Sequence, residues 1–232
     1  MTDEADGGGA TGPAGPARPA PGHEGSPLRR ALAAPGFRRL FAAQTISRWG
    51  DTFNSVALVV LVFDLTGSGV KVGVTVAFEI APVLLFGFVA GAVVDRLPRQ
   101  RVMVAADAGR AVVAVGLVVG QDHLWAIYAA AFALSSLSVF FNPAAASVVP
   151  ALVDEEDVVG ANAALWSAAV VSQIALAPLA GVLVATAGAG PAFALNAASF
   201  AASAALVAAL ALPAAVRPAP ARHLHDVREG LG

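Results

Sequence analysis

Residues 72–94 read VGVTVAFEIAPVLLFGFVAGAVV, an apolar run in which Glu79 is the one ionisable side chain. A helix needs about 20 mostly apolar residues to cross a bilayer, and this run has that length. Further apolar stretches occur within residues 40–212: Phe53–Phe63 with the residues upstream of it, Val102–Val119, Trp125–Phe141, Leu165–Ala187 and Phe193–Leu212. The sequence therefore predicts an all-α integral membrane protein with six transmembrane helices.

The composition agrees with this fold class. Hydrophobic residues make up 57% of the chain and charged residues 13%, whereas soluble domains carry about 25% charged residues. The absence of cysteine excludes disulfides and thiolate metal sites, and the four histidines do not indicate a metal cluster. No basic patch interleaved with aromatic residues suggests a nucleic-acid partner. We expect no cofactor, and the lipid bilayer as the main partner.

Both ends of the chain differ from the apolar middle. Residues 1–36 are rich in Gly, Pro and Ala, and the acidic residues Asp3, Glu4 and Asp6 begin them, unlike the basic start of a secretory signal. We predict a disordered cytoplasmic tail over residues 1–36, a six-helix bundle over 37–214 and the start of a cytoplasmic linker over 215–232.

The basic residues predict the orientation, because Lys and Arg are in excess in cytoplasmic loops. The connections expected on the opposite side carry only Lys71. The arginines that flank the apolar stretches are Arg29, Arg30, Arg38 and Arg39, then Arg96, Arg99 and Arg101, and finally Arg217, Arg222 and Arg228. Both termini are therefore expected to be cytoplasmic.

Prolines and acidic residues predict where helices end or bend. Asn142 precedes Pro143 and is expected to end the fourth helix, since a residue before proline disfavours the α conformation. Pro178 lies inside the fifth apolar stretch and predicts a kink or a free carbonyl. The acidic run over residues 154–157 is interpreted as a helix cap with a solvated face.

Polar residues recur along the first transmembrane stretch. Gln44, Arg48, Asp51 and Asn54 follow one another at spacings of three or four, which places them on one helix face. A charge in the hydrocarbon is costly, so this face is expected to line a cavity or path. The alternative is a structural pair in which Arg48 and Asp51 neutralise each other near the membrane surface.

Other polar residues within the spans have two readings each. Glu79 has no basic neighbour in its own helix, so it is a proton-coupling candidate together with Asp51, or else an inert polar anchor. Asp107 and Arg110 are spaced as a helical ion pair, and they are interpreted as a structural pair linked to the preceding loop, with a substrate site as the alternative. Gln173 and Asn196 either line the path or bond to neighbouring helices.

The loop between the second and third stretches carries the most specific motif. Residues 91–101 read GAVVDRLPRQR, which resembles the G-x-x-x-D-R-x-G-R-x-R signature of the major facilitator superfamily. Gly91, Asp95, Arg96, Arg99 and Arg101 match, and Pro98 replaces a glycine. The resemblance implies that the glycine permits close helix approach, the aspartate contacts a helix end in the other half of the transporter, and the arginines form a cytoplasmic gate.

A second motif lies in the fifth stretch. Ala177, Pro178 and Gly181 belong to a segment that resembles the G-P-x-x-G motif of antiporters and exporters, with Ala177 in place of the first glycine. Trp125–Phe141 lacks the arginine that is common in the fourth helix of drug–proton antiporters. Four further segments resemble the drug-efflux and enterobactin-exporter-like branch: Phe37–Leu40, Trp49–Asp51, Phe141–Ala144 and Asp226–Leu231.

The resemblance implies one half of a major-facilitator fold, built from two three-helix inverted repeats. The chain is then expected to be truncated, with a C-terminal six-helix half as its missing partner, in a bacterial cell membrane. The implied function is proton-driven export of small amphipathic molecules, with protons or another coupling ion as a further partner. The alternative is a six-helix scaffold or homo-oligomer without transport. No catalytic motif favours an enzyme.

Overall fold

The computed structural model describes residues 27–212, and all regular elements within them are helices. They are α1 (Pro27–Ala33), α2 (Pro35–Thr66), α3 (Gly69–Val94), α4 (Arg99–Gly120), α5 (Leu124–Val148), η1 (Val149–Ala151), η2 (Glu155–Asp157), α6 (Val158–Ala187) and α7 (Ala189–Ala208). In this part of the chain, six helices are long and apolar enough to cross a membrane. The predicted all-α membrane fold with six transmembrane helices is confirmed.

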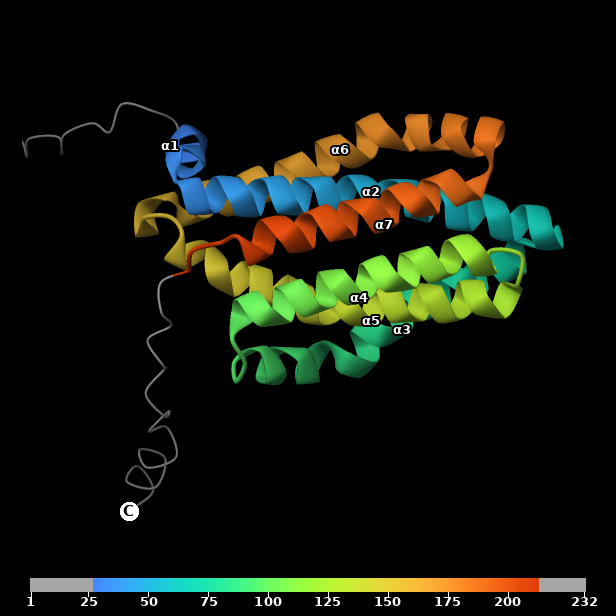
Figure 1. Ribbon diagram of the computed structural model, residues 1–232, viewed down its shortest axis with the longest axis horizontal. Coiled ribbons are helices and arrows are strands. Elements are labelled where there is room, and N and C mark those ends of the chain that lie inside the picture. The colour runs from blue at the N-terminus through green and yellow to red at the C-terminus, as the bar shows by residue number, and fades with distance from the viewer. Residues whose placement is uncertain (1–26, 213–232) are drawn as a thin grey trace, which may run out of the picture.

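Successive long helices run in opposite directions, so their connections alternate between the two ends of the bundle (Figure 1). The start of α2, the α3–α4 connection, η1 and η2, and the end of α7 lie together at one end, next to α1. This is the end that the arginines predict to be cytoplasmic, and the orientation in the membrane stays a prediction.

The helices pack in the spatial order α6, α2, α7, α4, α5, α3, because α7 lies between α2 and α4 while α5 contacts α3 and α4. If α2, α3 and α4 change places with α5, α6 and α7, respectively, the order is reversed and the same pairs of helices remain neighbours. Each set has three helices, so the second set enters the bundle from the opposite side to the first. Two three-helix inverted repeats have this arrangement.

A polar layer separates two apolar cores inside the bundle. The core at the α1 end contains Phe37, Leu40, Met103, Phe141 and Val207. The core towards the other end contains Leu58, Val62, Leu117, Ile127 and Phe193. Between them lie a smaller apolar cluster, which includes Leu134 and Phe200, and several buried polar side chains, among them Asp107, Arg110, Asn196, Ser199 and Ser203. Since charge is costly in an apolar interior, this layer is the first place to look for function.

The expectation of a disordered tail over residues 1–36 is wrong for its last part. α1 is folded, with Ala31 fully buried in the core at that end. Arg30 donates from Nε and Nη2 to Oδ1 of Asp157 at 3.0 and 2.8 Å. The expected solvated face is therefore wrong at Asp157, which is buried. Residues 1–26 and 213–232, with the predicted linker, lie outside the described residues.

The predicted helix end at Asn142 is also wrong, because α5 continues through Pro143 to Val148. Proline removes one backbone donor, and membrane helices tolerate this loss where neighbouring groups satisfy the freed carbonyl. Ala144 and Val148 are buried in the core beyond the proline, so packing favours continuation. Pro178 likewise lies within α6 without ending it.

α2 is longer than its apolar sequence suggests. Its 32 residues span roughly 48 Å at about 1.5 Å per residue, whereas the hydrocarbon is about 30 Å thick. The first turns carry Arg38 and Arg39, yet Phe37 and Leu40 are fully buried. These turns belong to the bundle because their apolar side chains complete the core at the α1 end.

Candidate functional site

A pocket of about 500 Å³ lies between α2 and α6. The α2 side is mostly polar and charged, whereas the α6 side is mostly apolar. Its lining comprises Gln44, Thr45, Arg48, Asp51, Thr52, Ser55 and Val56 from α2, and Leu165, Trp166, Ala169, Val170, Gln173 and Ala177 from α6. The pocket thus offers one wall to a polar or charged group and the opposite wall to an apolar surface.

The predicted polar face of α2 is only partly the wall of this pocket. Gln44, Arg48 and Asp51 line it, but Asn54 does not. A helix turns about 100° per residue, so two successive steps of three residues rotate Asn54 by about 120° from Arg48. Ser55 takes the pocket position instead. Asn54 is buried, and its Oδ1 has no hydrogen-bond partner in the part of the chain that the structure describes.

Arg48 and Asp51 form a loose ion pair that faces the pocket. Nη1 of Arg48 lies 3.8 Å from Oδ2 of Asp51, and their side chains are 48% and 35% exposed. No hydrogen bond joins the two groups within residues 27–212. Both charges are therefore available to a molecule or ion that enters the pocket.

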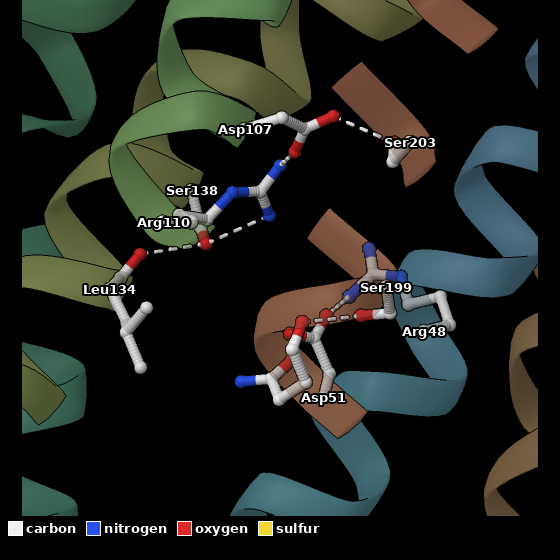
Figure 2. Close-up of polar contacts among 9 residues, drawn as sticks. Arg48, Asp51, Asp107, Arg110, Leu134, Ser138, Ser199 and Ser203 are labelled. Carbon is white, nitrogen blue, oxygen red and sulfur yellow. Dashed lines mark hydrogen bonds and ion pairs between the residues drawn. The ribbon is translucent and has the colours of Figure 1, made fainter. Parts of the chain in front are cut away.

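Asp107 and Arg110 form a second pair that is closed to solvent. Nη2 of Arg110 donates to Oδ1 of Asp107, and Ser203 on α7 donates to Oδ2 at 2.6 Å (Figure 2). The guanidinium of Arg110 lies between the rings of Phe141 and Phe200, 4.4 and 4.5 Å from their centroids. Both rings thus present their faces to the buried cation.

A close contact between α2 and α7 lies beside the loose pair. A Cβ atom on Gly50 would stand 1.9 Å from Oγ of Ser199 and 2.7 Å from Oδ1 of Asn196. A small residue at this position lets the two helices approach. Asn196 is fully buried, and among the described residues neither of its side-chain polar atoms has a hydrogen-bond partner. It lies in the α2–α7 contact and does not line the pocket.

Glu79 lies half-buried on α3, away from the lining of the α2–α6 pocket. Its main-chain carbonyl accepts a hydrogen bond from Ser135 on α5. The two predicted coupling carboxyls, Asp51 and Glu79, therefore do not line the same pocket.

The gate motif lies in and after the α3–α4 connection, at the α1 end of the bundle. Asp95, Arg96 and Arg101 are exposed, and no hydrogen bond or ion pair engages their side chains within residues 27–212. Arg99 donates to the carbonyl of Ser147 at 3.1 Å. A Cβ on Gly91 would meet no atom within 4 Å, so no described helix approaches it closely.

The glycine of the α6 motif, like Gly91, has no close neighbour in another described helix. Gly181 also has open space around its Cβ position, and Pro178 is exposed. Ala177, the first residue of the motif, lines the pocket. Close helix packing at Gly181 thus stays a prediction, while Ala177 is placed beside the polar wall of α2.

Several residues of the polar layer were not predicted as site residues. Ser199 and Ser203 follow Asn196 at spacings of three and four, and this polar face of an otherwise apolar helix was a readable signal. Gln100 was also missed: its Nε2 donates to the carbonyls of Val207, Ala208 and Leu210 at the end of α7. No local signal marks that glutamine, because its acceptors lie more than 100 residues away.

Residues 40–230 match the family model described as Major Facilitator Superfamily. The multidrug efflux pump Tap of Mycobacterium tuberculosis is 29% identical over 222 residues, covering 88% of this chain and 52% of that protein. The uncharacterized MFS-type transporter YfiS of Bacillus subtilis is 29% identical over 166 residues, covering 71% and 40%. Macrolide efflux protein A of Streptococcus pyogenes is 27% identical over 124 residues, covering 52% and 31%. The chain spans about half the length, or less, of these relatives.

Proposed function

The chain belongs to the major facilitator superfamily, and from this premise we propose that it supplies six helices of a secondary transporter that exports small amphipathic molecules. The observation that carries the proposal is the pocket between α2 and α6, with Arg48 and Asp51 on one wall and Trp166 on the other. An amphipathic molecule presents a polar group and an apolar surface at the same time, and the two walls match these two parts.

Two relatives support the direction of transport. One is named a multidrug efflux pump and another a macrolide efflux protein. Export by this chain fits these names and the partial match of the α6 motif. A siderophore-like substrate, as in the enterobactin-exporter-like branch, is the second substrate class that we propose to test.

Protons are the coupling ion that we propose, with Asp51 and Glu79 as the groups that carry them. Three carboxyls (Asp51, Glu79 and Asp107) and two guanidiniums (Arg48 and Arg110) lie on α2, α3 and α4, and two of the carboxyls form ion pairs with the guanidiniums. With all of them ionised the cluster has one excess negative charge, which is costly in a membrane. One proton, or one cation, neutralises it.

The gate proposal rests on the charges that the bundle leaves without a partner. Asp95, Arg96 and Arg101 have none within residues 27–212. We assign their partners to a further set of six helices, as the loop motif implies. Contacts that form and break there would open and close the pocket at the end of the bundle predicted to be cytoplasmic.

The test is an efflux assay in bacterial cells that express the gene from which this chain comes. Ethidium, rhodamine 6G, erythromycin and a catecholate siderophore serve as probes, with and without a protonophore. We expect the protein to lower the accumulation of at least one probe and the protonophore to abolish that effect. Asp51→Asn and Glu79→Gln should each abolish proton-dependent efflux, whereas Asp122→Asn, at an exposed turn, should not.

Two outcomes would contradict the proposal. Unchanged accumulation of all probes in cells that contain the folded protein would favour the alternative of a membrane scaffold. Efflux that persists with the protonophore, or in both carboxyl variants, would remove protons as the coupling ion while leaving export in place.

A further inference from the structure

Arg110 has donor capacity that its pairing with Asp107 does not use. A guanidinium has five N–H donors, and within the described residues Arg110 makes two side-chain hydrogen bonds, to Asp107 and to Ser138. Its Nε is buried with no hydrogen-bond partner. A buried donor without an acceptor is costly. A further acceptor near this guanidinium would therefore stabilise it.

A small polar cavity joins Arg110 to the loose pair on α2. It has a volume of about 10 Å³, close to the smallest space that holds one water molecule. Its lining comprises Gln44, Ser47, Arg48, Asp51, Arg110, Phe141 and Asn142. Figure 2 shows the two pairs in one view, with Asp107 and Arg110 on α4 and Arg48 and Asp51 on α2. The cavity thus connects the closed pair to the pair that faces the pocket.

Asp51 lacks a strong partner of its own. Arg48 is 3.8 Å away at the nearest atoms and half exposed, so water screens that attraction. Arg110 is buried between two aromatic rings, where charge interactions are screened much less. The charges that face Asp51 are those of Arg48 on its own helix, Arg110 and Asp107 on α4, and Glu79 on α3.

We propose that Arg110 is a positioning residue for Asp51: it reaches across from α4 and, through one water in the shared cavity, holds the Asp51 carboxyl in its charged form. The guanidinium then serves two carboxyls, with Asp107 bound directly and Asp51 through the water. Loss of the Arg110 charge leaves Asp51 near Glu79 and Asp107 with only Arg48 to balance it, and Asp51 retains its proton more often. The transport consequence rests on the proposed function, whereas the charge state of Asp51 does not.

The purely structural alternative assigns Arg110 to Asp107 alone. A neutral pair separates the two roles, because Asp107→Asn with Arg110→Gln replaces the ion pair by two amides that can bond to each other. Replacing both members of a buried ion pair is tolerated far better than removing one. If Arg110 serves only Asp107, the double variant leaves the protonated fraction of Asp51 unchanged. If Arg110 also serves Asp51, the double variant raises that fraction.

The readout is labelling by dicyclohexylcarbodiimide, which reacts with protonated carboxyls in apolar surroundings. The purified protein in detergent is treated and digested, and mass spectrometry gives the modified fraction of each carboxyl. We expect the Asp51 adduct to rise several-fold in the double variant. In Asp107→Asn alone, Arg110 is released to Asp51, and the Asp51 adduct should fall below that of the unaltered protein. Asp122 serves as the exposed reference carboxyl.

An unchanged Asp51 adduct in either variant, with the melting temperature retained, overturns the proposal. If the double variant does not fold, the single Asp107→Asn variant decides by the direction of its change. Efflux measured in parallel separates the two claims. The predicted labelling without any efflux by the unaltered protein would sink the proposed function alone, while proton-dependent efflux with unchanged labelling would sink the role of Arg110 alone.

Discussion

The bundle contains two Arg–Asp pairs at the same helical spacing, and they differ in almost every physical respect. Arg48 and Asp51 on α2 are separated by 3.8 Å and partly exposed to a pocket. Asp107 and Arg110 on α4 are 0% and 3% exposed, with further support from Ser203 and two aromatic rings. Identical spacing therefore produces an open pair that lines a pocket and another that is closed to bulk solvent.

The largest difference between the pairs should appear when the arginine is removed. Arg110→Ala leaves a buried carboxylate without its cation and should lower the free energy of unfolding by about 3–5 kcal/mol. Arg48→Ala should lower it by less than about 1 kcal/mol, because that pair is exposed. Chemical unfolding in detergent micelles, followed by tryptophan fluorescence, measures both. Equal losses would show that the two environments do not differ in energy.

The next effect concerns the contact that holds α2 against α7 beside the open pair. Gly50→Ala needs space that Ser199 and Asn196 occupy, and overpacking of this kind costs about 1–3 kcal/mol. Gly87→Ala, at a helical glycine with nothing within 4 Å, should instead be neutral or stabilising by up to about 1 kcal/mol. The same unfolding assay compares them.

Ser199→Gly provides a check on the cause of that loss. It removes the side-chain atoms nearest to the new methyl group, so the double variant Gly50→Ala with Ser199→Gly should recover part of the lost stability. A double variant that is less stable than either single variant would mean that the contact with Ser199 is not the reason.

A smaller effect should distinguish two serines of α7. Ser203 donates to the buried carboxylate of Asp107, whereas Ser199 donates to the carbonyl of Asn196 in its own helix. Ser203→Ala should cost about 1–2 kcal/mol and Ser199→Ala about 0.5 kcal/mol. A larger loss of stability in Ser199→Ala than in Ser203→Ala would contradict the prediction that the hydrogen bond to Asp107 is the more stabilising of the two.

The smallest expected effect concerns how accessible the two sides of α2 are to a reagent in solution. The chain has no cysteine, so Ser55→Cys and Ser47→Cys each introduce a single thiol with little change in volume. Ser55 lines the pocket, while Ser47 is 3% exposed beside the cavity of Arg110. A charged methanethiosulfonate should label the first rapidly and the second slowly, without a change in melting temperature. Equal rates would mean that the Arg110 cavity is open to bulky reagents.

Hydropathy and basic residues were enough to predict the number of long helices, because an apolar run of about twenty residues has the length that a bilayer requires. Helix ends were less predictable. The rule that proline follows a helix end failed at Pro143, since tertiary packing of Ala144 and Val148 outweighs a local preference. The folded part of the expected tail, α1, was missed because its partner Asp157 is 127 residues distant.

The candidate site was predictable only where one helix carries it. The periodicity of α2 identified Gln44, Arg48 and Asp51, which line the pocket, and placed Asn54 on the wrong side. The pairing of Asp107 with Arg110 followed from spacing, but its aromatic and serine partners come from α5 and α7. Which of two similar pairs is open depends on neighbours that no local pattern specifies.

The contact between α1 and Asp157 also imposes an order on biosynthesis. A ribosome that adds about 5–20 residues per second needs roughly 6 to 25 seconds to extend the chain from Arg30 to its partner, 127 residues later. During that interval the helices α2 to α5 are made before Asp157 is available to Arg30. α1 can therefore complete this contact only when synthesis has reached the start of α6, the fifth candidate membrane span.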